Sequence, residues 1–158
     1  IFTGAKTMTG GRILRLKSIL DKEEEFFMTY GDGVTNLNLN ELLKFHKSHN
    51  KIATVTAVHP PVRFGEVEIN KNQVTNFAEK KQAKSSWISG GFFILNKKIF
   101  NYIKNDETVF EEYPLEKITS EGQLMAYKHE GFWQCMDTLR EKKLLDDLWY
   151  KGVAPWKV

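Results

Sequence analysis

A short apolar run, directly followed by two glycines that flank an aspartate, indicates how the first part of this chain folds. Residues 26–30 read Phe-Phe-Met-Thr-Tyr, and Gly31, Asp32 and Gly33 follow directly. The run is too short for a helix and glycine ends it, so we predict a buried β-strand over residues 26–30. Asp32 would then lie at the carboxyl end of that strand, where ligands bind in open α/β sheets. Taken alone, these residues also fit a plain turn, because glycine and aspartate both favour turns.

A helix and a second strand follow the first strand. Asn38 and Glu41 have the spacing of a capping box, and the helix that they begin is expected to end near His49. Residues 52–58 are β-branched or apolar on both faces, which is typical of an interior parallel strand. Strand, helix and strand over about thirty residues form a βαβ unit. The sequence therefore predicts an α/β fold, with a Rossmann-like, mixed but mainly parallel sheet flanked by helices.

The remaining segments are predicted to form further helices and strands. Residues 12–20 have helical spacing, and Thr138 with Glu141 forms a second capping box before a last helix. We also predict a hairpin over residues 64–77, strands over 87–95, 124–129 and 132–136, and short helices over 97–103 and 115–120.

A pair of glycines interrupts the predicted strand over residues 87–95. Gly90 and Gly91 both weaken a strand interior, so they indicate a bulge or a close approach by a ligand or by the backbone. Packing against a neighbouring helix is the alternative that these residues leave open.

Composition excludes several classes of function. The chain has 158 residues, 41% of them hydrophobic, which is enough for one domain with a sizeable core. The net charge is only +3 and the lysines are scattered, which argues against a nucleic-acid partner. No apolar run reaches the ~18–20 residues that cross a membrane, so we expect no membrane partner. Cys135 is the single cysteine, which excludes an internal disulfide and suits a reducing, cytoplasmic setting.

Two aspartates at predicted strand ends suggest the chemistry. Asp137, like Asp32, follows a predicted strand, and the two carboxylates could meet around one Mg²⁺ that also binds phosphates. Asp137 alternatively complements the dipole of the last helix. The chain has neither a P-loop nor a dinucleotide-binding glycine motif. His46 and His49 share one helix face but lack a third ligand, so we assign them no metal.

Seven segments together carry a resemblance to a known family, and they span nearly the whole chain in order. The chain resembles the glucose-1-phosphate cytidylyltransferases within the sugar nucleotidyltransferase superfamily. The GDG and EK motifs mark only the superfamily, whereas FWQ-x-MDTLRE with the terminal APWKV is more specific. The segments are TMTGGR (7–12), TYGDGV (29–34), ATVTAVHPPVRFG (53–65), FAEK (77–80), WISGGFFIL (87–95), FWQCMDTLRE (132–141) and APWKV (154–158).

The resemblance implies a reaction and a set of catalytic residues. Members of the family join CTP and α-D-glucose 1-phosphate into CDP-glucose and release pyrophosphate. By resemblance, Asp32 and Asp137 are the Mg²⁺ ligands. Lys80 matches the lysine that holds the sugar phosphate, and these three residues form the implied catalytic set. Glu79 matches the acidic residue that accepts hydrogen bonds from the glucose hydroxyls.

The resemblance also implies residues that bind substrate without reacting. Thr7, Arg12 and Gly31 match positions near the nucleotide. Gly90 and Gly91 match backbone that lies against the sugar, which favours the ligand interpretation of that glycine pair. For Trp133, four residues before the second aspartate, we expect a packing or wall role. A homo-oligomer is implied for the full-length protein.

The chain departs from the family pattern in one important respect. Family members carry a glycine-rich G-x-G-T-R loop and a later lysine that cradle the triphosphate, and neither occurs in residues 1–158. We therefore expect a single domain that is the C-terminal part of a nucleotidyltransferase domain. Two alternatives stay open, namely a related sugar-1-phosphate nucleotidyltransferase that uses UTP or dTTP, and a non-catalytic module that binds nucleotide sugars.

Overall fold

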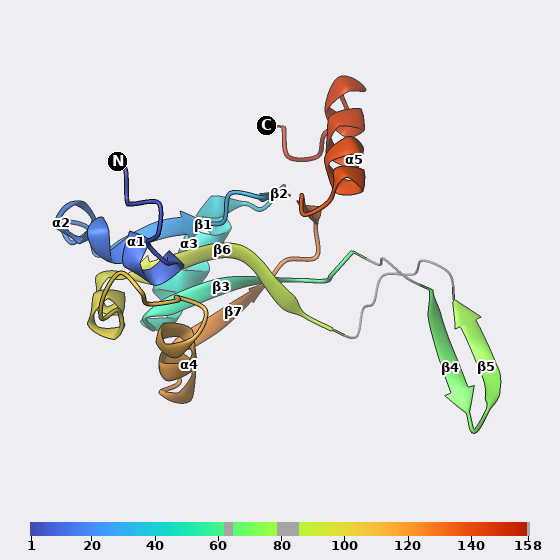
Figure 1. Ribbon diagram of the computed structural model, residues 1–158, viewed down its shortest axis with the longest axis horizontal. Coiled ribbons are helices and arrows are strands. Elements are labelled where there is room, and N and C mark those ends of the chain that lie inside the picture. The colour runs from blue at the N-terminus through green and yellow to red at the C-terminus, as the bar shows by residue number, and fades with distance from the viewer. Residues whose placement is uncertain (62–64, 79–85, 158) are drawn as a thin grey trace.

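A four-stranded sheet forms the centre of the protein. The computed structural model describes residues 1–61, 65–78 and 86–157. The sheet has the order β1-β6-β3-β7 (Figure 1), with strands β1 (Glu25–Thr29), β6 (Ile88–Asn96), β3 (Ala53–Val58) and β7 (Leu124–Lys128).

Three of these strands run in one direction and β6 runs against them. The strand β6 pairs antiparallel with β1 on one side and with β3 on the other, while β3 and β7 pair in parallel. The predicted α/β fold with a mixed, mainly parallel sheet is confirmed. The carboxyl ends of β1, β3 and β7 consequently meet at one edge, and we call this the carboxyl edge of the sheet.

Helices cover both faces of the central sheet, and successive side chains of β6 point alternately to the two faces. Phe93 and Leu95 pack into one apolar layer, and Ile94 packs into the other. The first layer holds α1 (Thr9–Arg15), the 3₁₀ helix η1 (Lys97–Tyr102) and α4 (Tyr113–Ser120), and α2 (Lys17–Leu20) follows α1.

The opposite layer is formed by α3 (Leu39–His49). Its N-cap Asn38 accepts hydrogen bonds from the backbone N–H groups of Asn40 and Glu41 at 3.0 and 3.2 Å, as expected. Glu41 Oε1 accepts from Lys44, and among the described hydrogen bonds none runs from the backbone N–H of Asn38 to Glu41, as a full capping box would require. Asn50 ends the helix in the left-handed conformation, at φ 54°.

A second, two-stranded sheet extends from the carboxyl edge. The strands β2 (Gly33–Thr35) and β8 (Trp133–Cys135) pair antiparallel, and α5 (Leu139–Tyr150) follows β8. Thr138 and Glu141 form the predicted capping box of α5. The hairpin of β4 (Glu66–Asn70) and β5 (Gln73–Ala78) stands apart from the sheets in Figure 1.

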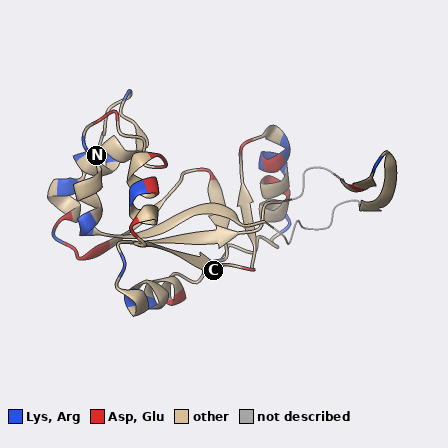
Figure 2. Ribbon diagram, turned by 90° about the horizontal axis from the view of Figure 1, so that it is seen from below, with Lys and Arg blue, Asp and Glu red and all other residues tan. Residues whose placement is uncertain are grey.

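Charges of both signs are mixed over the helices and loops, while the central strands carry few charges (Figure 2). This distribution agrees with the low net charge of +3. Among the helices that the structure describes, none combines the length and the apolar composition needed to cross a membrane.

Candidate active site

The small sheet brings the two predicted metal aspartates together. The pairing of β2 with β8 places Gly33 opposite Cys135, and the backbone N–H of Met136 donates to the carbonyl oxygen of Asp32 at 2.8 Å. Asp32 and Asp137 therefore have adjacent backbones although they lie far apart in the sequence. Both side chains are exposed at the carboxyl edge. Carboxylate oxygens are the ligands that Mg²⁺ prefers, so the chemistry of this pair suits magnesium, and its role as a metal site stays a prediction.

A third acidic residue stands beside Asp137. The Glu141 carboxylate accepts hydrogen bonds from the backbone N–H groups of Asp137 and Thr138, each at 2.9 Å. The ligand atoms of Cys135, Asp137 and Glu141 all lie within 4.8 Å of one another. The sequence analysis assigned Glu141 only a capping role and Cys135 no role. Sulfur is a poor ligand for Mg²⁺, so the oxygen pair of Asp32 and Asp137 suits that ion better than this group.

The glycine pair in β6 forms a bulge, as one of the two interpretations predicted. Val55 pairs with Phe93 and Ala57 pairs with Ser89, so three residues of β6 lie opposite a single residue of β3. The bulge turns the carbonyl oxygen of Gly90 toward Trp133, whose indole N–H donates to it at 2.8 Å. Trp133 therefore has the packing role that we expected.

Protein atoms fill the space that side chains at these glycines would need. A Cβ at Gly90 would lie 3.0 Å from Val58 Cγ1, and a Cβ at Gly91 would lie 2.6 Å from Tyr30 Cδ2. Gly91 also has a φ of +75°, which only glycine adopts readily. Packing accounts for both glycines without a ligand, and their contact with a sugar stays a prediction.

The predicted nucleotide residues lie on the loop and helix before β1 and in the turn after it. Thr7 is buried, whereas Arg12 is exposed and donates from Nη1 to Thr3 Oγ1 at 2.9 Å. Gly31 is exposed, with no atom within 4 Å of the position of an added Cβ. No described hydrogen bond joins these residues to Asp32, so the structure does not test their role.

The glycines of the TMTGGR segment have a structural role that the sequence analysis missed. The backbone N–H groups of Gly10 and Gly11 both donate to the carbonyl oxygen of Thr108, at 2.9 and 3.2 Å. A Cβ at Gly11 would lie 2.5 Å from the carbonyl oxygen of Asp106. These glycines therefore let α1 pack directly on the backbone of residues 106–108.

Tyr30 ties the end of β1 to the same region. Its hydroxyl donates to Glu111 Oε1 at 2.6 Å, and the hydroxyl of Thr9 donates to Glu111 Oε2 at 2.6 Å. Burial raises the pKa of Tyr30 above its ordinary value, and the hydrogen bond to Glu111 raises it further. The phenol is therefore neutral at physiological pH and acts as a hydrogen-bond donor. Because Glu111 accepts from both Tyr30 and Thr9, it links the end of β1 to α1.

The predicted sugar residues Glu79 and Lys80 lie outside the described residues. Beside Trp133, a cavity of about 220 Å³ opens at the carboxyl edge, and His59 and His129 line it. His59 lies against Trp87, with ring centroids 3.9 Å apart and the two rings tilted by 34°. His129 Nε2 lies 3.1 Å from both Thr35 Oγ1 and Asn36 Oδ1, which connects the ends of β7 and β2. Sequence spacing carried no signal for either histidine.

Comparison with known proteins agrees with the motifs. Residues 9–140 match the family model described as nucleotidyl transferase. The chain is 48% identical over 155 residues to the glucose-1-phosphate cytidylyltransferase of Salmonella typhimurium, covering 98% of this chain and 60% of that protein. It is 38% identical over 157 residues to the probable glucose-1-phosphate cytidylyltransferase of Bacillus subtilis, covering 99% and 61%.

A solved structure shares the fold. A putative glucose-1-phosphate thymidylyltransferase from Bacillus anthracis superposes with a TM-score of 0.66 at 17% identity, over 92% of this chain and 62% of that one. The chain thus spans about 60% of the length of these two cytidylyltransferases. The resemblance drawn from the motifs is confirmed by these matches.

Proposed function

This chain belongs to the nucleotidyl transferase family, and on that basis we propose that the protein transfers a cytidylyl group from CTP to α-D-glucose 1-phosphate. The products are CDP-glucose and pyrophosphate. The observation that carries the proposal is the 48% identity to a glucose-1-phosphate cytidylyltransferase over 98% of the chain. The adjacent backbones of Asp32 and Asp137 support it, because phosphoryl transfer between two anions needs a cation between them.

Asp32 and Asp137 are the residues that we propose hold Mg²⁺. A bound magnesium ion supplies charge neutralisation at the phosphate oxygens. Asp32 directly precedes β2 and Asp137 follows β8, so the β2–β8 ladder holds their backbones next to each other. The Glu141 carboxylate holds the backbone N–H of Asp137 and so orients the turn that carries this ligand.

The other proposed roles concern binding and orientation. An oxygen of the sugar phosphate attacks the α-phosphorus of CTP, and the bond to the departing pyrophosphate breaks on the opposite side. Lys80 would hold the sugar phosphate as a point charge, and Glu79 would accept from the glucose hydroxyls. Thr7, Arg12 and Gly31 would lie near the nucleotide. Such positioning is the main source of rate in this class of reaction.

Two further proposals concern the setting and the assembly. We place the activity in nucleotide-sugar biosynthesis in the cytoplasm, for which a single cysteine is suitable. We also propose that the full-length protein is a homo-oligomer. Exposed apolar side chains on α5, including Leu139 at 85% and Tyr150 at 84% exposure, provide a surface that two subunits would bury against each other. Light scattering coupled to size-exclusion chromatography measures the state of assembly directly.

Pyrophosphate release with glucose 1-phosphate and Mg²⁺ tests the activity. CTP, UTP, dTTP, ATP and GTP are supplied in turn to this chain and to a form extended by a preceding glycine-rich G-x-G-T-R segment. We expect release with CTP in the extended form. Release with UTP or dTTP alone would move the protein to another branch of the family. A folded protein that binds CDP-glucose but never releases pyrophosphate would be the non-catalytic module.

A further inference from the structure

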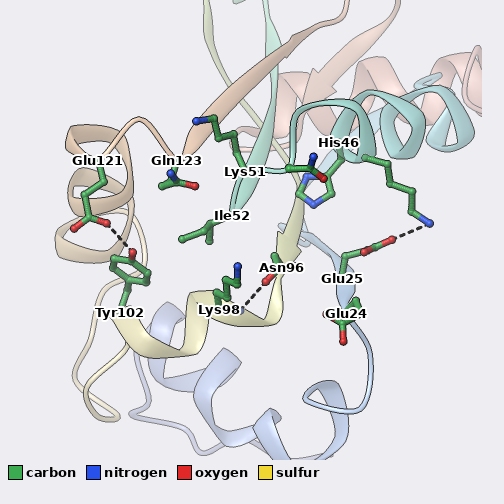
Figure 3. Close-up of a pocket in the computed structure, with 12 residues that line it drawn as sticks. Glu24, Glu25, His46, Lys51, Ile52, Asn96, Lys98, Tyr102, Glu121 and Gln123 are labelled. Atoms are coloured by element: carbon green, nitrogen blue, oxygen red, sulfur yellow. Dashed lines mark hydrogen bonds and ion pairs between the residues drawn. The ribbon is translucent and has the colours of Figure 1, made fainter.

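A large polar cavity lies at the edge of the sheet opposite the carboxyl edge. It has a volume of about 770 Å³, within the range of small-molecule sites. The residues before and at the start of β1, the end of α3 and the end of β6 form its walls, as Figure 3 shows. None of the residues assigned to the active site lines it.

The carboxylates around this cavity are already neutralised. Glu24 pairs with Lys97 at 2.7 Å, and Glu25 pairs with Lys47 at 2.9 Å. The third carboxylate, that of Glu121, pairs with Lys117 at 3.0 Å and also accepts from the hydroxyl of Tyr102 at 2.7 Å. These acidic side chains therefore leave little uncompensated negative charge at the cavity.

Two lysines at the same cavity have no such partner. Within the described part of the chain, the ammonium groups of Lys51 and Lys98 form no ion pair and no hydrogen bond. Figure 3 shows the Lys98 side chain extending from η1 toward the middle of the cavity. The cavity consequently presents two positive charges that no protein group balances.

A chain of hydrogen bonds adds a donor that faces the cavity to these charges. The backbone N–H of Lys51 donates to His49 Nδ1 at 3.0 Å, so the proton of this neutral imidazole is on Nε2. His49 Nε2 then donates to Thr54 Oγ1 at 2.8 Å, and the Thr54 hydroxyl donates to His46 Nδ1 at 2.8 Å. The proton of His46 is therefore on Nε2.

His46 is only 4% exposed, and it lines the cavity. Its Nε2–H forms no hydrogen bond with the residues that the structure describes. Among the described residues, His46 Nε2 is not one of the buried polar atoms that lack a partner, so this N–H is open to the cavity. An oxyanion in the cavity can accept from it in place of water. Burial lowers the pKa of His46, which keeps the imidazole neutral and so suited to this single donor role.

We propose that this cavity is a second ligand site that binds the phosphate group of a small phosphomonoester or a free phosphate through Lys51, Lys98 and His46 Nε2–H. Lysine binds phosphate as a compact charge with rotatable donors, and two lysines match the charge of a dianion. The proposal does not depend on the cytidylyltransferase activity, because the cavity lies at the opposite edge of the sheet from Asp32 and Asp137.

The test follows the imidazole ¹⁵N and ¹H resonances of His46 by NMR while inorganic phosphate is added at constant pH and ionic strength. We expect a saturable shift. The double variant Lys51→Gln/Lys98→Gln should weaken binding at least about tenfold, since two charge-assisted contacts are lost. His46→Asn keeps the acceptor for Thr54 but lacks the outward donor. Its binding, followed at the backbone amide resonances of Lys51 and Lys98, should be about two- to tenfold weaker.

The matched control is Lys44→Gln/Lys143→Gln, which removes the same charge from exposed positions outside the cavity. It should keep the phosphate affinity within about twofold. Glucose 1-phosphate and CTP are titrated in the same way, and the compound with the tightest binding that depends on Lys51 and Lys98 identifies the source of the phosphate. A non-saturable shift, or equal weakening by the two double variants, would overturn the proposal.

Discussion

The indole N–H of Trp133 donates to the carbonyl oxygen of Gly90 at 2.8 Å, and this bond joins β8 to the bulge of β6. Trp133→Phe removes the donor and leaves a buried carbonyl without it. We expect the free energy of unfolding to fall by about 1–2 kcal/mol, measured by urea denaturation. Trp149→Phe is the control, because Trp149 is 51% exposed and should change stability by less than about 0.5 kcal/mol.

Gly91 and Gly122 separate the effect of backbone conformation from the effect of a steric clash. Both have a positive φ, of +75° and +64°, but only Gly91 has an atom within 4 Å of an added Cβ. Gly122→Ala should therefore cost about 1–2 kcal/mol for the left-handed conformation alone. Gly91→Ala should cost about 1–3 kcal/mol more, because the Cβ overlaps the ring of Tyr30. Equal costs in denaturation experiments would contradict this account of Gly91.

Asp32 and Asp137 should each be required for Mg²⁺-dependent turnover. Asp32→Asn and Asp137→Asn remove one anionic ligand each while keeping side-chain size, and we expect kcat to fall about 10²–10³-fold. The assay is pyrophosphate release in the extended form, with circular dichroism to verify folding. Asp146→Asn on α5 is the control, since that carboxylate pairs with Lys142 and should leave kcat unchanged. Near-normal turnover in either active-site variant would refute the magnesium assignment.

The paired histidines of α3 should make stability depend on pH. Burial lowers the pKa of His46, and so does the neighbouring His49; burial and then Lys51 lower the pKa of His49. As the pH falls, these histidines therefore become protonated at a higher pH in the unfolded chain than in the folded chain. Stability should be complete above the ordinary histidine pKa of 6.5 and should decrease as the pH falls below it.

The slope of that decrease reaches at most about 1.4 kcal/mol per pH unit for each proton taken up. Urea denaturation between pH 7.5 and pH 5, roughly the range in which histidine changes its charge, measures it. His46→Asn keeps an acceptor for the Thr54 hydroxyl but cannot titrate, so its curve should be flatter. A variant curve parallel to that of the natural chain would show that His46 does not contribute.

Local signals in the sequence predicted most of the secondary structure. The apolar run over residues 26–30, the caps Asn38 and Thr138, and the strand-like run over residues 87–95 each depend on neighbours along the chain. β2 escaped prediction because residues 33–35 become a strand only by pairing with β8. The direction of β6 between β1 and β3 was likewise unspecified, since it depends on how distant segments pair.

The candidate site, too, was predicted from the sequence only in part. The sequence alone placed Asp32 and Asp137 after strands, and it predicted either a bulge or a close approach at Gly90 and Gly91, because strand ends and glycine pairs are local features. Only the tertiary structure decided that Trp133 and Tyr30 occupy the space beside those glycines.

Only the tertiary structure, too, brought the hydroxyl of Thr54 on β3 between His46 and His49 on α3. Hydrogen bonds between different elements depend on how those elements pack, and packing is set by the whole sheet rather than by residue spacing. The sequence therefore determined which groups could take part in chemistry, and the tertiary structure determined which of them meet.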